Sequence, residues 1–449
     1  MTKPAATAPD AASFSALVSR APMRAFQWIT VAVCMLVLVS DGVDMQLLGI
    51  LAPLVIRDFG VDRGTFGVAM SAALVGFGLG AWGGGRLGDM IGRRYALALA
   101  TLVFAGATIA ASRAEGVWSL ALWRACGGLG FGAAYSNALA MASEWLPERL
   151  RPVALSTLSV GTPLGGTVAG WIGPRLAESY GWRGAFATFG IATLVLVVVV
   201  LAALRDSPSF LLARGKVDQA ARAARRVLDE PVELAAEDGG GGPRIGVLDR
   251  TNLRLNLGIG MAFAASALVA YGILNWSTTF LTAAGFTLAQ AGHTVSVAGI
   301  TSMVGSISAG LLTRRYGSRQ VMGSVGALLV VLVVALAFAV GTLPPMPPVG
   351  ARSLIVCLLG ATAATFSAAI STFYVVMALG YPPACRSAGI GFGIFMSRLG
   401  AVAASGFGGT LLDLGRGSAT PFFAVLTVSA CFILVATLII DRHVPPMRP

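Results

Sequence analysis

The chain has 449 residues, of which 56% are hydrophobic and only 12% are charged. Soluble globular domains carry about 25% charged residues, so this composition excludes a soluble domain and predicts an integral membrane protein. The net charge of +12 would suit a nucleic-acid partner, but most basic residues lie on loops that we assign to the cytoplasmic side, and no DNA-binding motif accompanies them. We therefore expect a lipid bilayer, and no nucleic acid, as a partner.

The sequence carries none of the patterns that we would expect of an enzyme or a metalloprotein. Its five cysteines are scattered, mostly within apolar segments, without metal or disulfide spacing. A glycine loop before a lysine, which would bind phosphate, and an assembled nucleophile triad are also missing from the sequence. We expect no metal, no cofactor and no enzymatic activity.

Twelve apolar runs, each long enough for a membrane helix, follow one another along the chain. Their length and continuity favour helices over barrel strands, so we predict an all-α integral membrane protein with twelve transmembrane helices. One long polar connection divides the helices six and six. The predicted parts are a cytoplasmic tail (residues 1–26, disordered over 1–20), a first half (27–204), a cytoplasmic linker (205–253), a second half (254–441) and a cytoplasmic C-terminal tail (442–449).

The first predicted span, residues 27–53, contains two acids, Asp41 and Asp44. A charged carboxylate at the centre of a bilayer costs at least about 2.5–3.5 kcal/mol, so such an acid normally faces a cavity or a partner. The two acids are three residues apart and share one helix face. Two neighbouring carboxylates are suited to sharing a proton, so we interpret them as a candidate proton carrier.

The fourth predicted span, residues 118–142, contains Arg124. From the helical rise, Asp41 and Asp44 lie roughly 21–26 Å from the cytoplasmic end of their span, and Arg124 lies roughly 9 Å from the periplasmic end of its own span. These depths are similar, so we predict that Arg124 pairs with the deprotonated acids and that Asp41, Asp44 and Arg124 form one proton-coupling group. The alternative is a static buried ion pair that only fixes how the spans pack.

The loop between the second and third spans reads Gly-Arg-Leu-Gly-Asp-Met-Ile-Gly-Arg-Arg over residues 85–94, and residues 310–319 repeat it incompletely. This repeat predicts two pseudo-symmetric six-helix halves related by an axis along the membrane normal. In the linker, the pattern of residues 216–228 predicts an amphipathic surface helix. The run Gly239–Gly242 predicts a flexible break after it.

Arg398 lies roughly 15 Å into the eleventh predicted span. Its planar guanidinium can bind a carboxylate through two parallel hydrogen bonds, so we predict a substrate anchor. The alternative is an arginine that bonds backbone carbonyls or reaches toward the interface. Aromatic side chains that could stack on a substrate ring, each with helix packing as its alternative, are Tyr135, Tyr271, Trp276, Phe373 and Tyr374.

Two motifs resemble those of one transporter family. Residues 85–97 match Gly-x-Leu-x-Asp-x-x-Gly-Arg-Arg-x-x-Leu at every defined position, and residues 124–132 begin with Arg followed by spaced glycines. On these motifs the chain resembles the major facilitator superfamily over essentially its whole length. The resemblance implies that spans one and four line a central cavity, which makes Asp44 and Arg124 candidate substrate contacts. It also implies a gating group at the cytoplasmic side: Gly85, Asp89, Gly92, Arg93, Arg94, Glu144 and Arg386.

A narrower resemblance rests on Asp-Gly-Val-Asp at residues 41–44 and on the segments 381–389 and 397–400. These are similar to the signature of the aromatic acid:proton symporters. The resemblance implies uptake of an aromatic carboxylate such as benzoate or 4-hydroxybenzoate, driven by the proton gradient without a cofactor. It also implies a multi-pass protein of a bacterial inner membrane, and we expect both termini in the cytoplasm and a monomer.

Other functions stay open at this point. Residues 207–212 are similar to the middle-loop pattern of several carrier families, so a carrier for another small organic acid or a sugar-like solute is an alternative. Export is disfavoured because residues 161–166 lack the Gly-Pro pair of drug:proton antiporters. A membrane sensor is disfavoured because the linker is too short for a soluble output domain.

Overall fold

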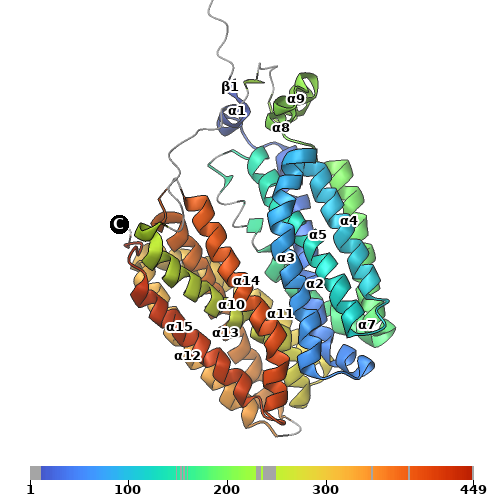
Figure 1. The fold of residues 1–449 in the computed structure, drawn as a ribbon, viewed down its shortest axis with the longest axis vertical. Coiled ribbons are helices and arrows are strands. Elements are labelled where there is room, and N and C mark those ends of the chain that lie inside the picture. The colour runs from blue at the N-terminus through green and yellow to red at the C-terminus, as the bar shows by residue number, and fades with distance from the viewer. Residues whose placement is uncertain are drawn as a thin grey trace, which may run out of the picture.

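The computed structural model describes residues 12–147, 149–151, 154, 157–158, 160–228, 234–235, 249–344, 347–382 and 385–446. Long helices make up most of this part of the chain (Figure 1). The long helices of the first half are α2 (Ala25–Phe59), α3 (Arg63–Ile91), α4 (Arg93–Ala111), α5 (Val117–Trp145) and α7 (Gly161–Ala203). Those of the second half are α10 (Leu253–Ala283), α11 (Leu288–Tyr316), α12 (Ser318–Gly341), α13 (Val349–Gly380), α14 (Arg386–Leu414) and α15 (Thr420–Ile439).

The helices account for the twelve predicted spans. Among the described residues, 10 helices are long and apolar enough to cross a membrane. One of them, α7, contains two spans, because Gly181 has non-helical dihedral angles (φ 68°, ψ 173°) that break it. The remaining span is α5, 29 residues long, in which Arg124, Glu144 and several glycines lower the mean hydropathy.

The N-terminal segment differs from the prediction of a disordered tail. Residues Ala12–Ser13 form β1, which pairs in parallel with β2 (Leu234–Ala235), and α1 spans Phe14–Arg20. Phe14 and Val18 are 1% and 2% exposed, and the Phe14 ring packs edge-on against Trp145 at 5.7 Å. Burial of these two apolar side chains against the end of α5 explains the order. Residues 1–11 lie outside the described part of the chain.

The linker begins with two short helices, α8 (Pro208–Ala213) and α9 (Val217–Ala224). The first was not predicted; Ser207 caps it by accepting a hydrogen bond from the Phe210 amide, and Pro208 occupies its first turn. The second is shorter than the predicted helix at 216–228, and it does bury one face through Ala220, Ala223 and Ala224. The predicted break at Gly239–Gly242 falls outside the described residues.

The two halves meet mainly along three helix pairs: α2 with α10, α3 with α14, and α7 with α11. Small residues allow this approach; a Cβ atom on Gly67 of α3 would lie 2.3 Å from the carbonyl oxygen of Gly406 on α14. The repeat is visible in the backbone as well. Gly92 after α3 and Gly317 after α11 both have positive φ, 98° and 81°, and ψ near 150°.

Candidate functional site

Asp44 and Arg124 form an ion pair inside the first half. Arg124 Nη1 donates to Asp44 Oδ2, and Nη2 donates to the Asp44 carbonyl oxygen at 3.4 Å. Thr108, on α4, donates to the second carboxylate oxygen, Asp44 Oδ1, at 3.0 Å. Asp44 is 6% exposed and Arg124 is 4% exposed. Both oxygens of Asp44 therefore have a donor, as a buried charge requires, and the pair joins α2, α4 and α5.

Asp41 has a different environment, although it lies less than one helical turn from Asp44. It is 1% exposed, and Thr162 Oγ1 donates to its Oδ2 at 3.3 Å. Its other oxygen, Oδ1, is buried without a hydrogen-bond partner. A Cβ atom on Gly42 would lie 2.1 Å from the Thr162 carbonyl oxygen, so α2 and α7 approach closely here only because residue 42 is glycine. This approach holds Asp41 against Thr162.

Arg398 reaches from α14 toward the first half. Its Nη1 donates to the Tyr271 hydroxyl at 3.0 Å, and its guanidinium carbon lies 3.8 Å from the centre of the Phe77 ring. A cation stacked on an aromatic face is stabilised by about 0.5–2 kcal/mol, depending on how far it is desolvated. Arg398 Nε is buried without a partner. Arg398 and Asp41 also attract each other electrostatically. Arg398, from the second half, therefore joins the charged group that the first half forms with Asp41, Asp44 and Arg124.

The predicted aromatic residues divide into two groups. Tyr135 packs edge-on against Phe77 at 5.8 Å, and Tyr374 is 41% exposed while packing against Phe263. Both lie in the neighbourhood of Arg398. In contrast, Trp276 and Phe373 are fully buried (0% exposed): the first donates to the Ala404 carbonyl oxygen at 3.2 Å, and the second packs on Phe263. In this structure those two residues are part of the helix packing.

Three neighbours of the charged group were missed by sequence reasoning: Phe77, Thr108 and Thr162. Phe77 is an ordinary apolar residue in an apolar span, and only the contact with Arg398 distinguishes it. The two threonines are polar residues within spans, which is a weak signal because Thr commonly bonds the carbonyl four residues earlier, as Thr108 also does to Phe104 at 3.0 Å. Partners on other helices could not be found from local sequence.

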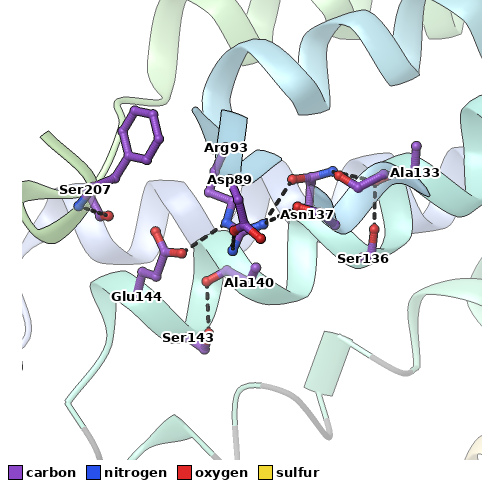
Figure 2. A network of polar contacts seen from close by, with 12 residues as sticks. Asp89, Arg93, Ala133, Ser136, Asn137, Ala140, Ser143, Glu144 and Ser207 are labelled. Atoms are coloured by element: carbon purple, nitrogen blue, oxygen red, sulfur yellow. Dashed lines mark hydrogen bonds and ion pairs between the residues drawn. The ribbon is translucent and has the colours of Figure 1, made fainter. Parts of the chain in front are cut away.

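The loop after α3 forms the predicted charged cluster around Arg93. Arg93 pairs with two acids, Asp89 and Glu144 (Figure 2). Its Nη2 lies 2.6 Å from Asp89 Oδ1, and its Nε lies 3.0 Å from Glu144 Oε1. The Nη1 of Arg93 donates to the Gly85 carbonyl oxygen at 3.1 Å, and Asn137 Nδ2 donates to the Gly84 carbonyl oxygen at 2.8 Å. The cluster ties the end of α3 to the start of α4 and the end of α5. These contacts lie within the first half, and the role of the cluster as a gate stays a prediction.

Arg94 and Gly92 point toward the linker. The Arg94 amide donates to Asp206 Oδ1 at 2.9 Å, and its guanidinium donates to the Leu201 carbonyl oxygen. Gly92 has φ 98°, and a Cβ atom there would lie 2.6 Å from the same Asp206 oxygen. Burial raises the pKa of Asp206, against the effect of the Arg94 amide. Arg386 begins α14, and its side chain lies outside the described part of the structure.

A cavity of about 810 Å³ lies apart from these charges, between α7, α11 and α13. It is lined in part by Trp171, Arg175, His293 and Arg352, and by none of the four charged residues Asp41, Asp44, Arg124 and Arg398. We take the charged group as the candidate site because buried charges in membrane spans mark ion and substrate paths, whereas this cavity opens at the ends of the helices.

A helical membrane protein of two repeated halves, with paired charges buried where spans meet, defines the class of secondary carriers. Residues 34–405 match the family model of the Major Facilitator Superfamily, so the chain belongs to this family of transporters. The predicted family and the twelve-helix fold are thereby confirmed, and so is the prediction that the chain is not an enzyme.

Curated relatives and solved structures resemble the chain over most of its length. The 4-hydroxybenzoate transporter PcaK of Pseudomonas aeruginosa is 28% identical over 425 residues, which cover 92% of this chain and 93% of that protein. A gallate transporter of Pseudomonas putida is 28% identical, with 95% and 94% covered. The xylose transporter XylE of E. coli, in a partially occluded inward open conformation, superposes with a TM-score of 0.71 at 16% identity, with 92% and 96% covered, and shares the fold.

Proposed function

We propose that this protein is a proton-coupled symporter that imports an aromatic carboxylate, of the benzoate or hydroxybenzoate kind, by alternating access. The single observation that carries the proposal is the group of two acids and two arginines within the spans, Asp41, Asp44, Arg124 and Arg398, with aromatic rings beside it. Acids supply a proton site, and a guanidinium next to aromatic rings supplies the chemistry that an aromatic acid needs. The names of the curated relatives favour the same substrate class.

The two acids have different roles in this proposal. Asp44 has donors on both oxygens, so it serves to hold Arg124. Asp41 has one buried oxygen without a partner and one long hydrogen bond, so it is the acid that exchanges the coupling proton. Protonation of Asp41 weakens its attraction to Arg398. Because this loss affects the outward-facing and inward-facing conformations differently, it shifts their populations.

Arg398 is the proposed anchor for the substrate carboxylate. Its Nε lacks a protein partner, and its Nη1 bonds only a neutral hydroxyl, that of Tyr271. A carboxylate would form stronger, charge-assisted hydrogen bonds with this fork. The Phe77 ring stacks on the guanidinium, Tyr135 packs on Phe77, and Tyr374 lies nearby, so these three residues are the proposed contacts of the substrate ring. The substrate carboxylate and the ionised Asp41 carboxylate compete for the positive charge of Arg398. Protonation of Asp41 therefore favours substrate binding, and this competition couples the substrate to the proton.

Placement in the cell follows from charge. Most of the basic residues lie on the two tails, on the linker and on the loops at the same side of the membrane as residues 85–94, and basic loops stay on the cytoplasmic side. We propose a bacterial inner membrane, both termini in the cytoplasm and a monomer. A carrier for another small organic acid is the second candidate, because Arg398 would bind any carboxylate.

A substrate screen in proteoliposomes with an imposed inward proton gradient tests the proposal. Benzoate, 4-hydroxybenzoate, protocatechuate, gentisate and nicotinate are compared with an aliphatic carboxylate and with xylose. Accumulation of at least one aromatic acid, abolished by a protonophore, is expected. Accumulation of the aliphatic acid or the sugar alone would contradict the proposal of an aromatic substrate. Movement of the substrate out of the proteoliposomes in exchange for entering protons would indicate export.

A further inference from the structure

A second cavity, of about 620 Å³, lies at the end of the first half where α3 ends, α4 begins and α7 ends. The linker helices α8 and α9 close its outer side; we call it the linker cavity. Its size falls in the range of small-molecule sites, roughly 300–1,000 Å³. Because three spans end beside it, the cavity lies at the surface of the membrane.

The linker cavity has a strong excess of positive charge. Its lining contains six cations and one acid, Asp206; the cations are Arg94, Arg205, Arg214, Lys216, Arg222 and Arg226. None of the six forms an ion pair with an acid among the described residues. Asp206 can offset at most one of the six positive charges, and its Oδ1 accepts a hydrogen bond from the Arg94 amide.

Several of these cations are held in place by backbone carbonyl groups. Arg94 donates to the Leu201 carbonyl oxygen, Arg205 donates to the Leu204 carbonyl oxygen at 2.6 Å, and Arg214 donates to the Met90 carbonyl oxygen. Carbonyl groups do not neutralise charge. Burial, followed by the charges of Arg94 and Arg226, lowers the pKa of Arg205 from its ordinary value. The cations are thus fixed close to one another and repel one another, which an anion would relieve.

We propose that the linker cavity binds a phosphate-bearing anion, and that the headgroup of an anionic phospholipid from the adjoining leaflet supplies it. Arginine and lysine are the side chains that bind phosphate oxygens in proteins. The rim of the cavity favours a lipid over a free ion, because Met90, Ile91 and Tyr95 line it and are 63%, 40% and 51% exposed. These apolar side chains can contact the glycerol and the acyl chains at the interface. A bound headgroup connects the linker helices to the loop that carries Asp89 and Arg93.

The test is thermal unfolding of the detergent-purified protein during titration with dioctanoyl phosphatidylglycerol. The cavity variant is Lys216→Gln with Arg222→Gln, two exposed residues that line the cavity. The control is Arg225→Gln with Arg250→Gln, two exposed residues outside the lining that remove the same charge. We expect the half-saturating lipid concentration to rise about tenfold in the cavity variant and to stay unchanged in the control. Dioctanoyl phosphatidylcholine and inorganic phosphate serve as the other ligands, and neither is expected to stabilise the protein at matched concentration.

Each other outcome would overturn the proposal. Equal lipid affinity of the cavity variant and the control would mean that only the overall charge attracts the lipid. Equal stabilisation by phosphatidylcholine would show that the phosphate of an anionic lipid is not recognised. Stabilisation by inorganic phosphate as strong as that by the lipid would assign the cavity to a soluble anion instead.

Discussion

Asp41 and Asp44 belong to one short motif, yet their surroundings give them opposite energetic roles. Asp44 neutralises Arg124 inside the membrane, where both residues are buried. Removing one partner of such a pair leaves the other charge uncompensated, which costs about 3–5 kcal/mol. We expect Asp44→Asn to lower the midpoint of thermal unfolding strongly and Asp41→Asn, which breaks no ion pair, to change it little. Equal losses of stability in the two variants would contradict this assignment.

Arg398 provides a second test at the residue scale. Lysine keeps the positive charge but lacks the planar fork, so Arg398→Lys should raise the apparent KM for an aromatic acid by about tenfold or more. Arg319→Lys, at an exposed position outside the site, is the matched control and should transport as the wild type does. If the KM of Arg398→Lys equals that of the control, Arg398 does not anchor the substrate.

The glycines of the loop motif at residues 85–94 are equivalent in the motif but not in the structure. Gly92 has φ 98°, and an added Cβ would contact Asp206, whereas Gly85 has nothing within 4 Å. We expect Gly92→Ala to destabilise the fold by about 1–3 kcal/mol, the cost of a backbone region restricted to glycine. Gly85→Ala, inside α3, should be neutral or slightly stabilising. Thermal unfolding of the two variants compares them directly, and a larger loss for Gly85→Ala would refute the interpretation.

The residues of the site were partly predictable for a physical reason. Charges within apolar spans are conspicuous, and helical rise alone put Asp44 and Arg124 at one depth, where the structure brings them into contact. The difference between Asp41 and Asp44 was not predictable, because it depends on Thr162 and Thr108, which other helices contribute. The packing of Trp276 and Phe373 was likewise hidden, since a membrane helix with apolar residues on all sides gives no sign of its cavity face.

At the scale of helices, α3 begins with a capping acid. Asp62 accepts hydrogen bonds from the Thr65 amide at 2.7 Å and from the Thr65 hydroxyl at 2.5 Å. These bonds lower the pKa of Asp62 below its ordinary value of 3.8. A group with a lowered pKa stabilises the fold fully above its unfolded value, and the stabilisation disappears as the pH falls through the folded value.

We therefore expect Asp62→Ala to cost about 1 kcal/mol at neutral pH, as the loss of a helix cap does, and the cost to shrink as the sample is acidified below the ordinary pKa. Asp62→Asn retains a capping oxygen and is the control. The measurement is thermal unfolding of the three proteins as a function of pH. A cost that stays constant into the acid range would show that the carboxylate charge has no part in the cap.

Long helices were well predicted because membrane spans must be apolar and long. The short elements were not. Helix α8 depends on a cap by Ser207 and on Pro208, and α1 depends on the burial of Phe14 and Val18 near Trp145, a residue far away in the sequence. Segments of this length do not form from local propensity alone.

At the scale of the whole molecule, the site includes residues of both halves. Arg398 of α14 stacks on Phe77 of α3, and Tyr271 of α10 accepts its hydrogen bond. At one end of the same helix pair, Asp413 of α14 accepts from the Arg63 amide of α3 at 3.1 Å. Relative motion of the halves must therefore change the surroundings of Arg398 and, through it, of Asp41. This geometry links the proposed proton site to the proposed alternation between conformations.

The most direct test of this account is uptake of a labelled aromatic acid, chosen from the substrate screen, into proteoliposomes containing wild-type protein or Asp41→Asn. Under an imposed pH gradient the wild type should accumulate the acid above equilibrium. Asp41→Asn should reach equilibrium only, yet still exchange labelled for unlabelled substrate in counterflow, because its substrate site is intact while its proton site is lost. Accumulation by Asp41→Asn to the wild-type level would contradict the proposed role of Asp41 in proton coupling.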